Sequence, residues 1–134
     1  QYLLDAAFGG SERRREVAAR YGALLGNVKG LVLPSPPSWC DLPSWFVYVV
    51  QLPEDVRRDE VLRLLSLRGV ENRAYFTPIP LQPFYAERFG YRRGHFPEMD
   101  RVCARVVALP FFTDLSAEEQ TYVAQSLQDV LRLA

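Results

Sequence analysis

Helix-forming and short strand-forming segments alternate along the chain, and this alternation constrains its fold more than any other feature. The strand-forming segments are residues 45–52, 72–76 and 106–111, with a shorter one after Asn27. Apolar residues at helical spacing lie between and around them. Strands interleaved with helices of this length predict an α/β (α+β) two-layer sandwich, in which a small and mostly antiparallel sheet is covered by helices. A chain of 134 residues suits one domain with a single core.

Two helices are predicted in the first half of the chain. The first covers residues 12–25, with Ser11 as its N-cap and Gly26 directly after its end. The second covers residues 57–68 and ends at Gly69, where a glycine can adopt the left-handed conformation that commonly closes a helix. Both segments place apolar residues on one face, so each helix is expected to pack against the sheet.

Two further helices are predicted in the second half. Pro97 is a favourable first residue for a helix that runs to about Arg105. Ser116 and Glu119 form a capping box before the last helix. The residues expected to be buried by the three amphipathic helices are Val17, Tyr21, Leu24, Leu25, Val61, Leu64, Leu65, Val123, Leu127, Val130 and Leu131.

The segment WFVYVVQL, residues 45–52, has the clearest strand character. It is rich in β-branched and aromatic residues without polar alternation, which predicts a central strand covered on both faces. Four prolines precede it within residues 34–43, so we expect an exposed, extended loop there.

The charge balance excludes some classes of partner. Sixteen basic residues match sixteen acidic ones, so the chain has no general attraction for nucleic acid or an anionic membrane. No run of residues is apolar enough to span a membrane, and the N-terminal sequence lacks the pattern of a signal peptide. We therefore expect a soluble, cytoplasmic protein. The cluster Arg13–Arg15 is interpreted as a solvated helix face rather than a phosphate-binding patch.

No motif for a self-contained catalytic or metal site is present. The two cysteines, Cys40 and Cys103, are far apart, and His95 is the only histidine, so neither a zinc site nor a disulfide is expected. His95 is expected to lie in a solvent-facing loop. Lys29, the only lysine, lies in the turn NVKG, where nothing promises the desolvation that a Schiff-base lysine needs. We predict no catalytic residue and no metal ligand in this chain.

The segment ENRAYFTPIPLQPFY, residues 71–85, is the main candidate for binding. Its prolines restrict the backbone, so it is expected to hold a fixed shape without regular hydrogen bonding. Arg73 offers a planar guanidinium to a carboxylate or phosphate, and Tyr75, Phe76 and Tyr85 offer flat faces to a ring or a partner protein. The alternative is that the aromatic rings fill the core and Arg73 pairs with a surface acid.

The order of motifs in the second half resembles a known family. The sequence ENRAYFTPIPLQPFYAERFGYRRGHFPEMDRVCARVVALPFFTDLSAEEQ is similar to the C-terminal region of the DegT/DnrJ/EryC1/StrS family, pyridoxal-phosphate-dependent aminotransferases that act on nucleotide-linked keto sugars. In that family R-x-[YFH]-[FY]-x-P-[IL]-H-x-Q-P-x-Y is followed by G-Y, F-P, a helix, an [AS]-L-P strand and a capped helix. The first half also fits, so the resemblance covers about residues 11–133.

The resemblance implies a division of the chain and of the chemistry. Residues 1–10 would be the remnant of a connecting segment, and residues 11–134 the small domain, an α/β sandwich like that of fold-type I aminotransferases. The family's large domain carries the Schiff-base lysine and most contacts to pyridoxal phosphate. This chain alone is therefore expected to bind no cofactor and to be inactive. The full-length enzyme would be a homodimer that transfers an amino group, usually from glutamate, to the sugar.

The resemblance also implies which residues face the substrate or cofactor. Carried over by position, these are Arg73, Tyr75, Thr77, Pro80, Gln82 and Tyr85. The sequence departs from the family pattern at three places. Pro80 stands where the family most often has histidine, His95 stands where an acid often precedes F-P, and Gly9-Gly10 is expected to interrupt a helix that is commonly continuous.

Two other functions stay open. The chain could be a stand-alone interaction module that uses the proline-rich segment, or an apolar face, to bind itself or another protein. It could also bind a nucleotide sugar alone, although half a cleft rarely buries enough ligand surface.

Overall fold

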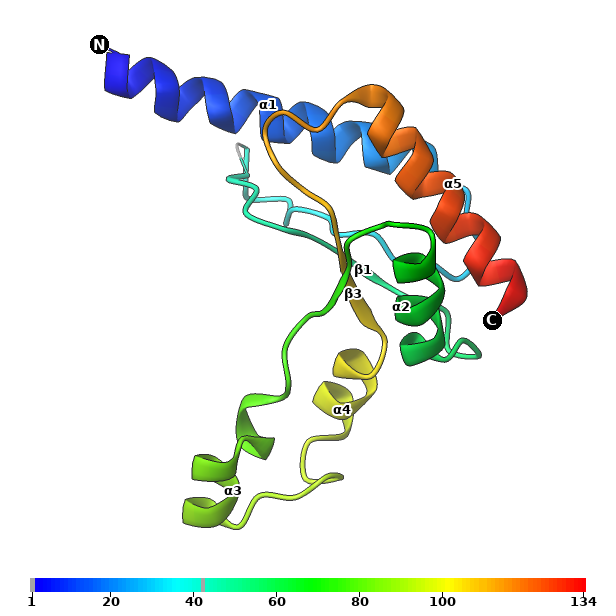
Figure 1. Ribbon diagram of the computed structural model, residues 1–134. Coiled ribbons are helices and arrows are strands. Elements are labelled where there is room, and N and C mark those ends of the chain that lie inside the picture. The colour runs from blue at the N-terminus through cyan, green and yellow to red at the C-terminus, as the bar shows by residue number, and fades with distance from the viewer. Residues whose placement is uncertain (1, 42) are drawn as a thin grey trace.

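The computed structural model describes residues 2–41 and 43–134, and it contains a three-stranded sheet with helices packed against it (Figure 1). The elements are, in chain order, α1 Tyr2–Leu25, β1 Tyr48–Gln51, α2 Arg58–Leu67, β2 Arg73–Ala74, the 3₁₀ helix η1 Ile79–Leu81, α3 Pro83–Phe89, α4 Pro97–Cys103, β3 Val106–Leu109 and α5 Ala117–Leu133. The sheet is antiparallel throughout these strands, so the predicted two-layer sandwich is confirmed.

The strand order is β1-β3-β2, which makes β3 the central strand and corrects the expectation that residues 45–52 form the centre. On its other side β1 makes only an isolated bridge, between Val32 and Gln51. Side chains along β1 alternate between buried and half-buried, so one face of the strand is fully covered rather than both. A strand's position within a sheet depends on distant pairing partners, which its own composition does not contain.

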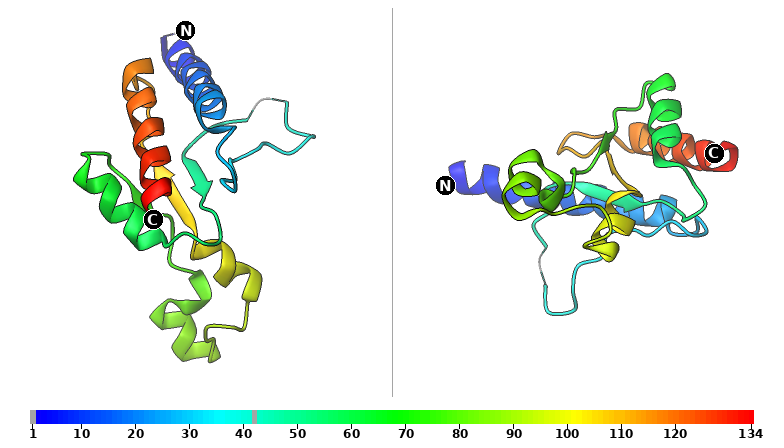
Figure 2. Two further views of the ribbon diagram at one scale, coloured as in Figure 1. Left: turned by 90° about the vertical axis from the view of Figure 1, so that its right-hand side faces the viewer. Right: turned by 90° about the horizontal axis from the view of Figure 1, so that it is seen from below.

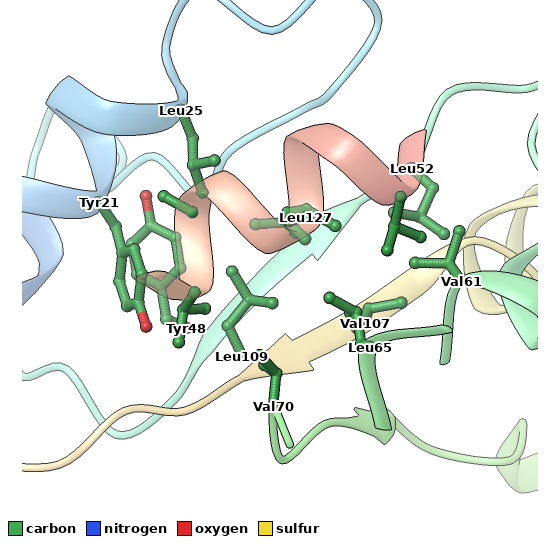
Figure 3. Close-up of a cluster of buried hydrophobic side chains, with 14 of the residues drawn as sticks. Tyr21, Leu25, Tyr48, Leu52, Val61, Leu65, Val70, Val107, Leu109 and Leu127 are labelled. Carbon is green, nitrogen blue, oxygen red and sulfur yellow. The ribbon is translucent and has the colours of Figure 1, made fainter. Parts of the chain in front are cut away.

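The core lies between the sheet and helices α1, α2 and α5. Figure 3 shows side chains from all five of these elements, α1, β1, α2, β3 and α5, meeting in one cluster. The tyrosine rings of Tyr21 and Tyr48 pack with their centroids 4.9 Å apart, and the Tyr21 hydroxyl donates to the Pro110 carbonyl at 2.9 Å. Every residue expected to be buried by the amphipathic helices is either buried or packed against this cluster.

Helix α1 is longer than predicted. It runs without a break through Gly9 and Gly10, so the expected interruption there is wrong, and Ser11 lies inside the helix instead of capping it. The Ser11 hydroxyl accepts a hydrogen bond from Arg15 at 3.2 Å. A helical glycine costs only about 1 kcal/mol relative to alanine, and strong helix formers on both sides outweigh that cost. Of the arginine cluster, Arg13 is solvated, whereas Arg14 is half-buried and donates to the Trp45 carbonyl at 3.4 Å.

Helix α5 begins and packs as predicted. The Ser116 hydroxyl accepts from the Glu119 N–H, and the Glu119 carboxylate accepts from the Ser116 N–H, which completes the capping box. α5 lies beside α1 (Figure 2), and the fully buried Gln120 connects them. Its amide donates to the Val17 carbonyl at 2.9 Å and accepts from Arg20 at 2.6 Å.

Residues 75–104, here called the arm, extend away from the sandwich (Figure 1). The arm contains η1, α3 and α4, so the expected proline-rich loop without regular hydrogen bonding is wrong. Pro83 is the first residue of α3, a position where proline needs no N–H donor. No residue in the range 71–106 is buried. The predicted strand at 72–76 shortens to the two residues of β2, because the chain leaves the sheet to enter the arm.

The structure also places several residues that the sequence singled out. His95 lies exposed in the segment before α4, and Lys29 lies exposed in the turn after α1. Cys40 and Cys103 are free thiols. Among the described residues, no helix is long and apolar enough to cross a bilayer, and no group of three or more His, Cys, Asp or Glu side chains is placed to hold a metal ion.

Candidate functional site

A cleft of about 720 Å³ lies where the arm meets the sandwich. Its walls come from the start of α2, from α4 and the residues before β3, and from the segment that follows β2. This volume lies within the range of small-molecule sites. Charged side chains dominate the lining, with five arginines and three carboxylates: Arg57, Arg58, Arg93, Arg101, Arg105, Glu54, Asp59 and Asp100. The cleft therefore has a local excess of two positive charges in a chain whose net charge is zero.

Glu54 is held between two of these arginines. Its carboxylate accepts from Arg105 at 2.5 Å and from Arg101 at 3.2 Å. The hydrogen bonds from Arg105 and Arg101 lower the pKa of the exposed Glu54 carboxyl. Arg105 is the more buried arginine, with a side chain 12% exposed, and its Nε–H is buried without an acceptor in the described part of the chain.

The other two carboxylates are also engaged. Asp59 accepts from its neighbour Arg58 at 3.2 Å, and Asp100 accepts from the Gly94 N–H at 2.6 Å. Arg58 also donates to the Cys103 carbonyl at 2.6 Å, which ties the end of α4 to the start of α2. All three acids thus have partners within the protein.

Phe76 forms an aromatic edge of the cleft. Its φ of 63° is in the left-handed region, which bulky residues seldom adopt, and its side chain is 67% exposed. The ring packs against that of Tyr75, with centroids 4.1 Å apart. This strained backbone turns the chain from β2 into the arm and leaves a flat apolar face open to a ligand.

The residues proposed from the family resemblance do not all reach one pocket. Thr77 lines the cleft, but the other five do not. Arg73 has a side chain 80% exposed and pairs with Glu71 at 3.6 Å, as the alternative interpretation expected. Tyr85 lies on α3 against Phe84 and Phe89, so it does not fill the core.

Two of the remaining candidates shape the start of the arm. Pro80 is half-buried within η1, and Gln82 is exposed at the junction of η1 and α3. The Gln82 carbonyl accepts from the N–H groups of Tyr85 and Ala86 in the first turn of α3. Their contact with substrate or cofactor stays a prediction.

Sequence reasoning missed the arginine lining. Its members come from three segments that are separated in the chain, and only folding brings them around one cleft. The available signal was the bias to fifteen arginines against one lysine, with adjacent pairs at 57–58 and 92–93. Lys29 does not line the cleft, so the cleft offers no amine for a Schiff base and does not by itself fit pyridoxal phosphate.

Comparison with known proteins finds relatives that are similar in sequence and in fold. The erythromycin biosynthesis sensory transduction protein EryC1 of Saccharopolyspora erythraea is 32% identical over 117 residues, which are 87% of this chain and 31% of the relative. The crystal structure of DesV from S. venezuelae, in complex with a ketimine intermediate, superposes with a TM-score of 0.83 at 27% identity, over 96% of this chain and 33% of that one. DesI in the presence of its TDP-sugar product superposes with a TM-score of 0.79 at 28% identity, over 96% and 33%.

The chain spans about a third of the length of the curated relatives it matches. A family model covers residues 4–128, which is most of the chain. The sequence motifs, the antiparallel sandwich and these similarities agree. The chain therefore belongs to the DegT/DnrJ/EryC1/StrS aminotransferase family.

Proposed function

We propose that this chain is the C-terminal small domain of a pyridoxal-phosphate-dependent aminotransferase that transfers an amino group, from glutamate, to a nucleotide-linked keto sugar. The observation that carries the proposal is the family match over residues 4–128, combined with relatives about three times as long. DesI, studied with its TDP-sugar product, supports a nucleotide sugar as the substrate class. Residues 1–10 would then belong to the connection to a large domain, and residues 11–134 to the small domain.

In this proposal the cofactor belongs to the large domain. Bound pyridoxal phosphate would supply the electron sink for amino transfer. The lining of the cleft contains no lysine, which supports this division. The share of the small domain is to form one wall of the substrate pocket, with Arg73, Tyr75, Thr77, Pro80, Gln82 and Tyr85 as its candidate residues. Aromatic faces and an exposed guanidinium suit a sugar ring and a carboxylate or phosphate.

The experiment is to trap the cofactor in the natural-length protein with borohydride and to map the modified lysine. We expect a pyridoxyl-lysine outside residues 1–134 and amino transfer from glutamate to a TDP-linked keto sugar. Modification of Lys29 would overturn the division between domains. Failure of the natural-length protein to bind the cofactor at all would overturn the proposed activity.

One observation favours a second candidate, a protein-interaction module. The arm exposes several large apolar side chains, among them Phe76, Ile79, Phe84 and Phe89 at 54–67% exposure. Exposed apolar groups of this kind mark interaction surfaces. Light scattering distinguishes the candidates if the natural polypeptide is close to 15.4 kDa. A stable dimer that is lost on Phe84→Ser and Phe89→Ser substitution supports the module, and a monomer at all concentrations contradicts it.

A further inference from the structure

We propose that the arm is a hinged unit, and that the ion pair between Glu54 and Arg101 holds it in a closed position from which it swings away to widen the cleft. This inference concerns movement rather than ligand chemistry, and it does not rest on the proposed function. Among the described residues, no residue of the arm belongs to the buried core or to the partly buried side chains packed against that core. Apolar packing against the core therefore does not fix the angle between the arm and the sandwich.

Contacts within the arm join its helices into one body. A row of aromatic rings runs from α3 to the segment before α4. The ring of Tyr85 stacks on that of Phe89 with centroids 6.2 Å apart, and Phe89 stacks on Tyr91 at 5.6 Å. Tyr91 in turn meets Phe96, the residue before α4, edge-on at 5.2 Å. Aromatic pairs at these distances attract one another, so α3 and α4 are expected to move together.

The contacts between the arm and the sandwich are few by comparison. In the part of the chain that the structure describes, two side-chain hydrogen bonds cross this boundary. Arg101 on α4 donates to the Glu54 carboxylate at 3.2 Å, and Arg58 at the start of α2 donates to the Cys103 carbonyl at 2.6 Å. The Glu54 and Arg101 side chains are 73% and 51% exposed, and exposed ion pairs stabilise a conformation only weakly. The closed position therefore depends on contacts that break easily.

The charges around Glu54 allow the ion pair to open without leaving a group unpaired. The Glu54 carboxylate also accepts from Arg105, which belongs to the sandwich because its backbone carbonyl accepts from the Leu52 N–H at 2.9 Å. Arg101 also donates to Glu98, on its own helix, at 2.8 Å. When the arm swings away, Arg105 keeps Glu54 and Arg101 keeps Glu98. The open and closed positions are therefore expected to be close in free energy.

The hinge points lie where the chain enters and leaves the arm. At the entrance, Phe76 has a φ of 63°, a strained conformation for a bulky residue, so a rotation out of this region would relieve strain and redirect the arm. At the exit, Ala104 is the C-cap of α4 and directly precedes Arg105. Residues at the ends of elements commonly absorb the dihedral changes of a hinge motion.

The test is to measure the distance between the arm and the sandwich in the natural-length protein. Nitroxide labels are attached through an unnatural keto amino acid at the exposed positions Glu87 on α3 and Leu67 on α2, so that Cys40 and Cys103 stay unlabelled. Double electron–electron resonance then gives the distribution of distances between the labels. We expect a main population and a second one at longer distance. The ratio of the second to the first should rise by about twofold or more in Glu54→Gln.

The matched control is Glu16→Gln, which removes the same charge from an exposed ion pair with Arg13 on α1. Its distance distribution should equal that of the unaltered protein. Raising NaCl from about 0.1 M to about 1 M shortens the screening length from about 10 Å to about 3 Å, which should shift the unaltered protein towards the longer distance and change Glu54→Gln little. A distribution that Glu54→Gln leaves unchanged, or that Glu16→Gln shifts equally, would overturn the proposal. Because neither cofactor binding nor amino transfer is measured, failure here and failure of the proposed function are distinguishable.

Discussion

Gln120 is a fully buried polar side chain that joins the two longest helices. Its amide group both donates to the Val17 carbonyl and accepts from Arg20. A buried polar group is stabilising only while its partners are present, and removing one side leaves the other unsatisfied. The position of α1 against α5 therefore depends on this residue as well as on apolar packing and on the hydrogen bond from the Gln128 amide to the Leu24 carbonyl.

Gln120→Leu should lower the free energy of unfolding by about 1–3 kcal/mol, because it removes both hydrogen bonds and leaves the half-buried Arg20 without its acceptor. Urea denaturation followed by circular dichroism measures the change. The control is Gln125→Leu, an exposed position on the same helix, which should change stability by less than about 0.5 kcal/mol. Equal effects at the two positions would contradict a specific role for Gln120.

At the scale of single elements, the capping box of α5 is the clearest case in which sequence alone determined local structure. Ser116→Ala removes the hydroxyl that accepts from the Glu119 N–H, and we expect a loss of about 1 kcal/mol. Urea denaturation again gives the value. Ser44→Ala, at an exposed position outside helices and strands, should have no measurable effect. An unchanged urea midpoint for Ser116→Ala would show that apolar packing, and not the capping box, stabilises α5.

The same box predicts a dependence on pH. The backbone N–H and side chain of Ser116 lower the pKa of the Glu119 carboxyl below its usual value. A carboxyl with a lowered folded-state pKa stabilises the fold above its unfolded pKa of about 4.3, and that contribution is lost as the pH falls through the folded pKa. Glu119→Gln keeps an acceptor oxygen but has no such dependence. Between about pH 6 and about pH 3, the difference in free energy of unfolding between the unaltered protein and Glu119→Gln should shrink as the pH falls. Urea unfolding curves measure it, and a difference that stays constant would contradict this prediction.

The helical faces could be predicted because apolar spacing and capping are local. The same logic failed for α1, where the cost of Gly9 and Gly10 is smaller than the gain from the formers around them, and for α3, where Pro83 begins a helix instead of preventing one. It also placed residues 45–52 at the centre of the sheet, because strand order is decided by pairing with β3 over a long separation. The arginine cleft could not be predicted either, because its arginines come from segments that are far apart in the chain.

At the scale of the whole molecule, the two buried tyrosines make the stability of the core depend on pH in the alkaline range. Burial raises the pKa of Tyr48 to about 12, and burial also raises the pKa of Tyr21, whose hydroxyl is held by Pro110. In the unfolded chain both ionise near pH 10. The stability that they contribute is complete below that pH and is lost as the pH rises through the folded values.

We therefore expect the free energy of unfolding to fall between about pH 10 and about pH 12, with a shallower fall in Tyr21→Phe. Tyr21→Phe should also be less stable at neutral pH, because it lacks the hydrogen bond to Pro110. Urea titrations across this range measure both effects. An identical slope in the variant would mean that Tyr21 ionises as readily in the folded protein as in the unfolded chain.

The buried core and the exposed recognition surface belong to different parts of the molecule. The core lies in the sandwich, and the arm extends from it into solvent. Because no residue of the arm is classed as buried, substitutions there remove no side chain from the buried core. The sequence motif that resembles the family nevertheless lies largely in the arm, so we expect selection on those residues to act through what the arm contacts and not through the stability of the core.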